Sequence, residues 1–178
     1  MQITITPLAD EGVTVLPPDI VWNGIVGDFA LSAGGDDGPA GGLVAANPLK
    51  TAVVLLLFSD GRADPSDLRF EMRGDRRGWA GDGFDLDTAG GEAPLGSKLW
   101  LYRRAVLTDL TGMEMAAEAE RALQPLVRQG AVARICTQAT VDKVGGRVLL
   151  AVSLYGHNGR DLYTQQFDLL WRRADGGL

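Results

Sequence analysis

The chain has 178 residues, of which 46% are hydrophobic and 22% are charged, and its formal net charge at pH 7 is −6. This length suits one domain spanning residues 1–178, with a core of ordinary size. The acidic balance argues against nucleic acid as the main partner, because binding phosphates requires a basic surface. The single cysteine, Cys136, excludes an internal disulfide, and we expect it to lie at least half-buried in a strand.

Nothing in the sequence suggests a targeting or membrane segment. Residues 1–8 lack a basic region followed by an apolar run, so they do not form a signal peptide. The longest apolar run, Ala52–Phe58, is too short to cross a bilayer. We therefore expect the protein to be made and folded in a cytoplasm, without a membrane partner.

The first 45 residues predict an N-terminal β-hairpin. Two short strand-like segments, 19–24 and 27–31, flank a turn near Asn23-Gly24. Residues 32–42 are rich in glycine and contain two aspartates, which predicts a loop.

A helix over residues 49–58 follows. Asn47 can cap it, Pro48 suits the first helical position, and Gly61 can end it in the left-handed conformation. Because this segment is apolar on all sides, it needs cover on more than one side, from the chain itself or from another subunit. A buried strand is the alternative, which the Asn-Pro start and the length disfavour.

Residues 61–95 form a long connecting loop with weak periodicity. Residues 96–107 then predict a short helix. Thr111 and Glu114 match a capping box, which opens a longer helix through about Gln129, with Gly130 as its stop.

The last third alternates with period two and predicts three strands, over residues 131–141, 147–155 and 162–171. Glycine-containing turns at 145–146 and 157–159 join them into an antiparallel meander with one face on the helices. The predicted fold class is therefore α+β: an N-terminal β-hairpin, and two to three helices packed on a C-terminal three-stranded antiparallel sheet.

The chemistry of residues 60–104 favours binding over catalysis. Arginine, tryptophan and glycine recur there, and arginine and tryptophan are the side chains that carry most binding energy at protein interfaces. No nucleophile and base, no metal-ligand set and no phosphate-binding glycine loop is visible, so we predict no catalytic residues, no metal and no cofactor.

Three arginine doublets each have an aromatic neighbour: Arg76-Arg77 with Trp79, Arg103-Arg104 with Tyr102, and Arg172-Arg173 with Trp171. Such pairs can stack on RNA bases, but in an acidic chain we favour pairing with carboxylates of the chain or of a partner. Two structural alternatives stay open. Trp79 and Trp100 can be core residues, and Asp75 and Asp82 can pair with Arg76 and Arg77 to close the loop.

An acidic segment between residues 82 and 92 is the alternative site. Its carboxylates miss the spacing of a calcium loop, but a pair of them could serve a hydrolase. The residues concerned are Asp82, Asp85, Asp87 and Glu92.

At these residues the sequence resembles the small baseplate proteins of Mu-like contractile-tailed phages. The resemblance covers nearly the whole chain and is most specific in residues 75–82 (DRRGWAGD) and 96–100 (GSKLW). Where the family commonly has a second tryptophan after Trp79, this chain has Ala80. The family is similar to the small wedge proteins that start sheath assembly in larger contractile phages.

The resemblance implies a structural protein of the virion tail baseplate, assembled in the host bacterial cytoplasm, that contacts other wedge proteins and the first sheath ring. Relatives carry a glutamate–proline–arginine segment that docks on the helical core of the wedge, and here only Arg62 of that segment is kept. An edge of the terminal sheet, at 131–141 or 162–171, could accept a strand of the sheath protein. The candidate partner-binding residues are Arg62, Asp75, Arg76, Arg77, Trp79, Asp82, Lys98, Trp100 and Arg103.

Overall fold

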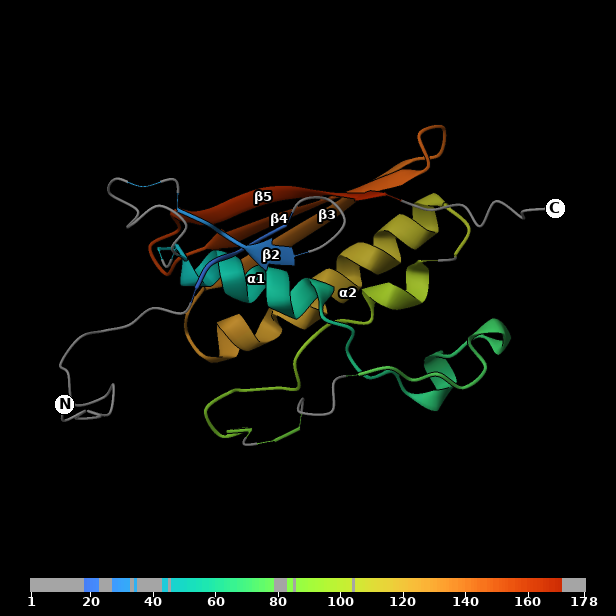
Figure 1. The fold of residues 1–178 in the computed structure, drawn as a ribbon, viewed down its shortest axis with the longest axis horizontal. Helices are drawn as coiled ribbons and strands as arrows, with labels where there is room; N and C mark the ends of the chain where they lie inside the picture. The colour runs from blue at the N-terminus through green and yellow to red at the C-terminus, as the bar shows by residue number, and fades with distance from the viewer. Residues whose placement is uncertain are drawn as a thin grey trace, which may run out of the picture.

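The computed structural model describes residues 18–22, 27–32, 34, 43–44, 46–78, 83–84, 86–103 and 105–170. It confirms the α+β class, with a small N-terminal hairpin, two α-helices and a three-stranded antiparallel C-terminal sheet (Figure 1). The strands are β1 Ile20–Trp22, β2 Gly27–Phe29, β3 Arg134–Asp142, β4 Arg147–Tyr155 and β5 Asp161–Leu170. The helices are α1 Pro48–Phe58 and α2 Asp109–Arg128, with short 3-10 helices η2 Pro65–Asp67, η3 Phe70–Met72 and η4 Leu99–Tyr102.

The C-terminal sheet has the order β3-β4-β5, with β4 in the centre. Alternate side chains of β4 are completely buried and form the floor of the core, as the period-two pattern predicts: Val148, Leu150, Val152 and Leu154. The helix α2 packs along this face (Figure 1). The first strand begins at Arg134, three residues later than predicted, and Cys136 on it is exposed, contrary to the expectation that it is at least half-buried.

The long helix α2 begins three residues earlier than predicted. Its N-cap is Thr108, whose hydroxyl oxygen accepts a hydrogen bond from the Thr111 amide at 3.1 Å. The capping box predicted at Thr111 and Glu114 is therefore wrong, and the Thr111 hydroxyl instead donates to the Val106 carbonyl at 2.8 Å. The predicted stop is confirmed, because Gly130 follows the helix with a φ of +73°.

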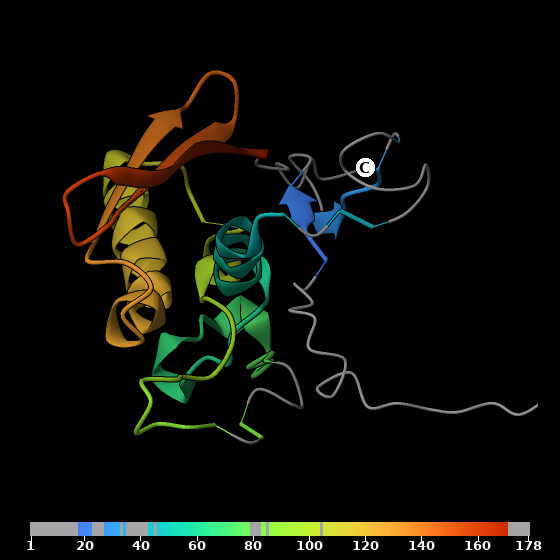
Figure 2. The same ribbon diagram turned by 90° about the vertical axis from the view of Figure 1, so that its left-hand side faces the viewer.

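The apolar helix α1 is covered by the chain's own elements. Figure 2 shows it between the β1–β2 hairpin on one side and the α2–sheet layer on the other. Its last residue, Phe58, contacts Phe167 of β5 edge-on, with ring centroids 5.0 Å apart. Asn47 caps the helix as predicted. The predicted left-handed end at Gly61 is wrong, since the helix ends at Ser59 with extended backbone.

A buried carboxylate ties the hairpin to α1. Asp19 is 5% exposed, and its side chain accepts hydrogen bonds from the amides of Ala46 and Asn47 at 3.1 and 2.9 Å. The Ile20 amide donates to the Thr51 hydroxyl at 2.9 Å. A carboxylate near the N-terminus of a helix is also favoured by the helix dipole. The turn predicted at Asn23-Gly24 lies outside the described residues.

The segment predicted as a short helix over 96–107 is the single 3-10 turn η4. It packs against α1 and α2, whereas η2 and η3 lie farther from the sheet (Figure 1). Within the described residues, no helix has the length and apolar character needed to cross a membrane.

Candidate functional site

Two chain segments meet at the end of α1 through a parallel backbone bridge between Asp60 and Ser97, called here the 60/97 bridge. The Gly61 amide donates to the Ser97 carbonyl at 2.8 Å, and the Ser97 amide donates to the Ser59 carbonyl at 3.0 Å. The approach is close enough to require glycine. At Gly96, where φ is +104°, an added Cβ would lie 2.6 Å from the Ser59 carbonyl oxygen.

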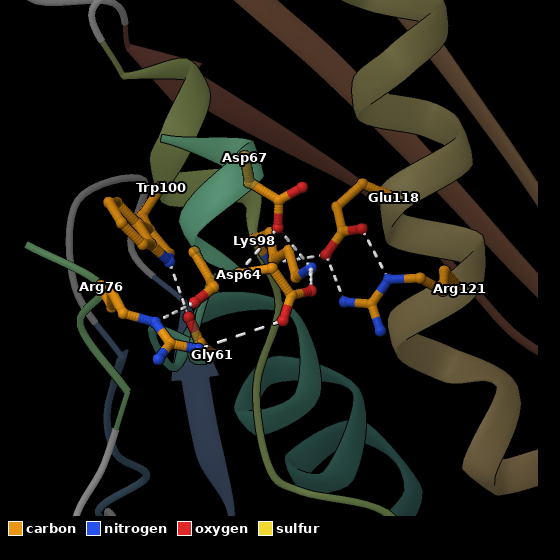
Figure 3. A network of polar contacts seen from close by, with 9 residues as sticks. Gly61, Asp64, Asp67, Arg76, Lys98, Trp100, Glu118 and Arg121 are labelled. Carbon is orange, nitrogen blue, oxygen red and sulfur yellow. Dashed lines mark hydrogen bonds and ion pairs between the residues drawn. The ribbon is translucent and has the colours of Figure 1, made fainter. Parts of the chain in front are cut away.

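Trp100 lies against this bridge. Its indole N–H donates to the Gly61 carbonyl at 2.8 Å, and the residue is 6% exposed (Figure 3). The guanidinium of Arg77 lies over the ring, 4.7 Å from its centroid. Of the two roles open for Trp100 from sequence, the structure therefore shows the core role, with the ring supporting an arginine at the surface.

A single carboxylate holds two arginines of the candidate set together. Arg77 and Arg103 donate to different oxygens of Asp60, at 2.6 and 3.2 Å. Arg77 also faces Asp75, with 3.7 Å between its Nε and the carboxylate. These groups are partly or largely exposed, so each ion pair contributes little stability but fixes the direction of a guanidinium.

These side chains surround a recess of about 310 Å³, called here the arginine recess. Its lining combines three guanidinium groups and one carboxylate with apolar groups: Arg69, Met72, Asp75, Arg77, Trp100, Leu101 and Arg103. Arginine offers several N–H donors in a planar fork, the geometry that matches a carboxylate. The recess is thus chemically suited to an acidic group with an apolar neighbour.

Arg76 and Arg62 lie outside this lining. The Arg76 Nε donates to the Ala63 carbonyl at 2.7 Å, and its terminal nitrogen is 4.0 Å from Asp64. Arg62 is exposed and reaches the Arg77 carbonyl at 3.5 Å.

The sequence left open that Asp75 and Asp82 pair with Arg76 and Arg77 to close the loop, and the structure shows this pairing only in part. Asp75 faces Arg77, whereas Arg76 bonds elsewhere. The predicted residues Trp79 and Asp82 lie outside the described residues.

Lys98 joins the recess region to α2 (Figure 3). Its ammonium group is 2.6 Å from Asp67 and 3.1 Å from Asp64, and its backbone amide donates to the Glu118 carboxylate of α2. The same carboxylate accepts from Arg121, with 2.7 Å between Nε and oxygen. The hydrogen bond that Lys98 donates to Asp67 lowers the pKa of Asp67 and raises the pKa of Lys98.

Lys98 is among the residues predicted from sequence, but its carboxylate partners are not. Asp64 and Asp67 are separated from Lys98 by more than thirty residues, and Glu118 lies twenty residues away on another element. A weak signal exists for Asp67, because Asp64-Pro65 begins a short helix in which the Asp67 side chain accepts from the Asp64 amide at 2.9 Å.

In the acidic segment considered as an alternative site, the carboxylates of Asp87 and Glu92 accept hydrogen bonds from backbone amides of the same segment. Glu92 accepts from the Asp87 amide at 2.8 Å, and Asp87 accepts from the Gly90 amide at 2.9 Å. Asp82 and Asp85 lie outside the described residues. Within the part of the chain that is described, no group of three or more acidic, histidine or cysteine side chains is placed to hold a metal ion.

The fold is α+β, and its arginine recess gathers arginine side chains that carboxylates of the chain hold in place. The chain belongs to the family described as Phage protein GP46, whose model matches residues 49–161. It is 35% identical over 120 residues to the baseplate protein gp46 of Escherichia phage Mu, a match that covers 67% of this chain and 74% of that protein. These matches confirm the resemblance to the baseplate proteins of Mu-like phages. No solved structure matches the chain.

The 60/97 bridge predicts unequal effects of two glycine substitutions. Gly96→Ala would force a Cβ against backbone atoms of Ser59 and Gly61, whereas Gly130, with a similar positive φ, has open space. We expect Gly130→Ala to cost about 1 kcal/mol from backbone strain alone, and Gly96→Ala to cost at least about 2 kcal/mol more. Urea unfolding of both variants measures this. Equal losses would show that the bridge opens at little cost.

The Lys98 network predicts a pH-dependent contribution to stability. Because the pKa of Asp67 is lowered by folding, its contribution is full above the unfolded pKa near 3.8 and is lost as the pH falls through the lower folded value. Lys98→Met should therefore reduce the free energy of unfolding by about 0.5–1 kcal/mol at pH 7, and by less at pH 3. Urea titrations at both pH values test this.

The matched control is Lys143→Met. Lys143 pairs with Asp109 at 3.0 Å, but both side chains are largely exposed, so its loss should have almost no effect. A Lys98→Met loss that is unchanged between pH 7 and pH 3 would contradict the proposed pairing with Asp67.

Proposed function

We propose that this protein is a structural subunit of a phage tail baseplate. The observation that carries the proposal is the family match over residues 49–161, which reaches from α1 to the start of β5 and includes the whole arginine recess. The relative from phage Mu is itself named a baseplate protein. The role is one of assembly in the virion tail and requires neither catalysis nor a cofactor.

More specifically, we propose that the protein is a wedge subunit of a contractile tail of the Mu-like type, from a phage or prophage, assembled in the host bacterial cytoplasm. Its partners are other wedge proteins and the first sheath ring, with no nucleic acid, membrane or small-molecule substrate. What supports this step is the resemblance of residues 75–82 and 96–100 to the small baseplate proteins of Mu-like phages, a family that is similar to the small wedge proteins.

The arginine recess is the proposed contact with another wedge protein. Among the residues predicted from sequence, those exposed enough to touch the partner are Arg62, at the side of the recess, and Asp75, Arg77 and Arg103 in its lining. Arg69 is also exposed in the lining. Arg76, Lys98 and Trp100 position them, through the contacts to Ala63, Asp67 and Gly61. Trp79 and Asp82, which lie outside the described residues, are proposed as partner contacts from the sequence alone. Because the guanidinium groups are already held, docking orders few side chains, which favours affinity.

The terminal sheet is the proposed contact with the sheath. Both β3 and β5 are edge strands, since β4 is paired on each side. An edge strand carries unpaired backbone groups to which an extended segment of another chain can add. A strand of the sheath protein could therefore extend the sheet at one of these edges.

Loss of recess arginines should reduce incorporation into baseplates. In the double variant Arg69→Ala, Arg103→Ala we expect a folded chain whose association with the other baseplate proteins is weaker by about tenfold or more, because interface arginines are frequent hot spots. Affinity capture of the tagged chain during tail assembly measures the effect.

The control for this experiment is Arg128→Ala, Arg160→Ala, which removes the same charge from exposed positions outside the recess and outside the edge strands β3 and β5. If the recess variant enters tails as well as this control does, the recess is not the contact.

Proline substitutions test the sheet edge. Along an edge strand, backbone amides alternate between pointing at the neighbouring strand and pointing away from it. Of the variants Gln165→Pro and Gln166→Pro on β5, one should therefore unfold the sheet and the other should leave it folded. The folded one should stop sheath growth on the baseplate, as seen by electron microscopy. Normal sheaths with a folded variant, repeated on β3 with the same result, would refute strand addition.

A further inference from the structure

The exposed face of α2 carries an apolar stripe that the fold does not use. Leu110, Met113 and Ala117 follow one another at helical spacing of three and four residues, so they lie on one side of the helix. Leu110 is 63% and Met113 is 71% exposed. The opposite side of the same helix, with Met115, Ala119 and Leu123, is buried in the core, so this second apolar face, called here the α2 stripe, is separate from the core.

The apolar surface continues beyond the start of the helix. Val106 precedes the N-cap and is 79% exposed. The β3–β4 turn lies next to this end of α2, because Lys143 in the turn is 3.0 Å from Asp109, and the adjacent Val144 is fully exposed. Several exposed large apolar side chains grouped at one place are typical of a protein interface.

The charges beside the α2 stripe indicate what it contacts. Glu114 and Glu120 border it on opposite sides, given the 100° rotation per residue of a helix. Glu118 is paired with Arg121, and Asp109 with Lys143. Within the described residues, Glu114 and Glu120 form no ion pair. An apolar seam with unpaired acidic borders is complementary to an apolar seam with basic borders.

A second copy of this chain fits poorly. If the apolar segments of two α2 helices faced each other, the contact between them would be centred near Met113. Glu114 of one copy would then lie close to Glu114 of the other. Like charges across an interface disfavour association. A basic partner has no such conflict.

We propose that the α2 stripe binds an amphipathic helix of another baseplate protein, whose apolar residues are bordered by lysine or arginine. The inference rests on the proposed baseplate function and adds to it a second surface, distinct from the arginine recess, together with the chemistry of its partner. A helix laid on α2 would contact Leu110, Met113 and Ala117 and would pair with Glu114 and Glu120.

Cross-linking from the α2 stripe identifies the occupant. In a Cys136→Ser background, Met113→Cys carries a photo-activated cross-linker, and the full chain is assembled into tails with the other tail proteins. The expected product joins position 113 to a segment of another tail protein with apolar residues at helical spacing and adjacent lysines or arginines. A cross-link to a second copy, a cross-link to a segment without that pattern, or no cross-link from chain recovered in tails would overturn the proposal.

Charge reversal tests the borders. With the partner segment identified, Glu114→Lys and Glu120→Lys should each weaken binding by about fivefold, and the reciprocal change of the partner's lysine to glutamate should restore it. Unchanged affinity would overturn the proposal. The two levels of inference fail differently: a chain that never enters tails contradicts the baseplate function, whereas a chain present in tails with a free stripe contradicts only the inference about α2.

Discussion

The candidate site depends on one close backbone contact, the 60/97 bridge. It joins the residues that follow α1 to the residues that precede η4, and both segments would otherwise be independent loops. The bridge places the Gly61 carbonyl where it accepts a hydrogen bond from the Trp100 indole N–H, and the Arg77 guanidinium lies over the indole ring. It also places Lys98 beside Asp67 and Glu118. One contact between two glycine-containing segments thus fixes the aromatic, the arginines and the lysine of the region.

The apolar character of α1 has a related explanation. A helix buried on several sides forms the centre of a small protein only if other layers surround it, and here the hairpin, α2 and the sheet do so (Figure 2). Because α1 is held firmly, its C-terminal end is a fixed point from which the 60/97 bridge can start. The Ser97 hydroxyl strengthens this link, since it donates to the Leu57 carbonyl in the last turn of the helix at 2.5 Å.

The elements with strong local signals could be predicted from sequence. The meander of the sheet followed from period-two alternation, and α1 followed from Asn47-Pro48. The start of α2 was misplaced because Thr111, with Glu114 three positions on, matches a capping box, whereas Thr108 is followed at that distance by Thr111. Only the surrounding structure shows that Thr108 is the N-cap. The role of Gly61 was also misjudged. Glycine at this position suggested a helix end. In the structure, the missing side chain instead lets the Ser97 backbone approach, and a contact with a residue so distant in sequence cannot be read from the local pattern.

The same reasoning explains why the candidate residues were found but not their arrangement. Arginine and tryptophan are recognisable as binding residues by type alone, but the carboxylates that orient them are ordinary loop residues in sequence. Asp60 accepts from both Arg77 and Arg103, and only the bridge brings these three together.

This arrangement reconciles an arginine-rich site with an acidic chain. Each guanidinium that bonds to Asp60 has five N–H donors and uses few of them in that contact, so further donors remain for a partner. The carboxylate reduces the local charge and keeps the donors in place. A chain of net charge −6 cannot attract an acidic partner through its overall charge. Selectivity at the recess therefore comes mainly from the direction of its hydrogen bonds.

The α2 stripe differs from the recess, because its acidic borders are unpaired and attract a basic partner. Two surfaces of different charge allow one subunit to bind two different neighbours without either one occupying the place of the other.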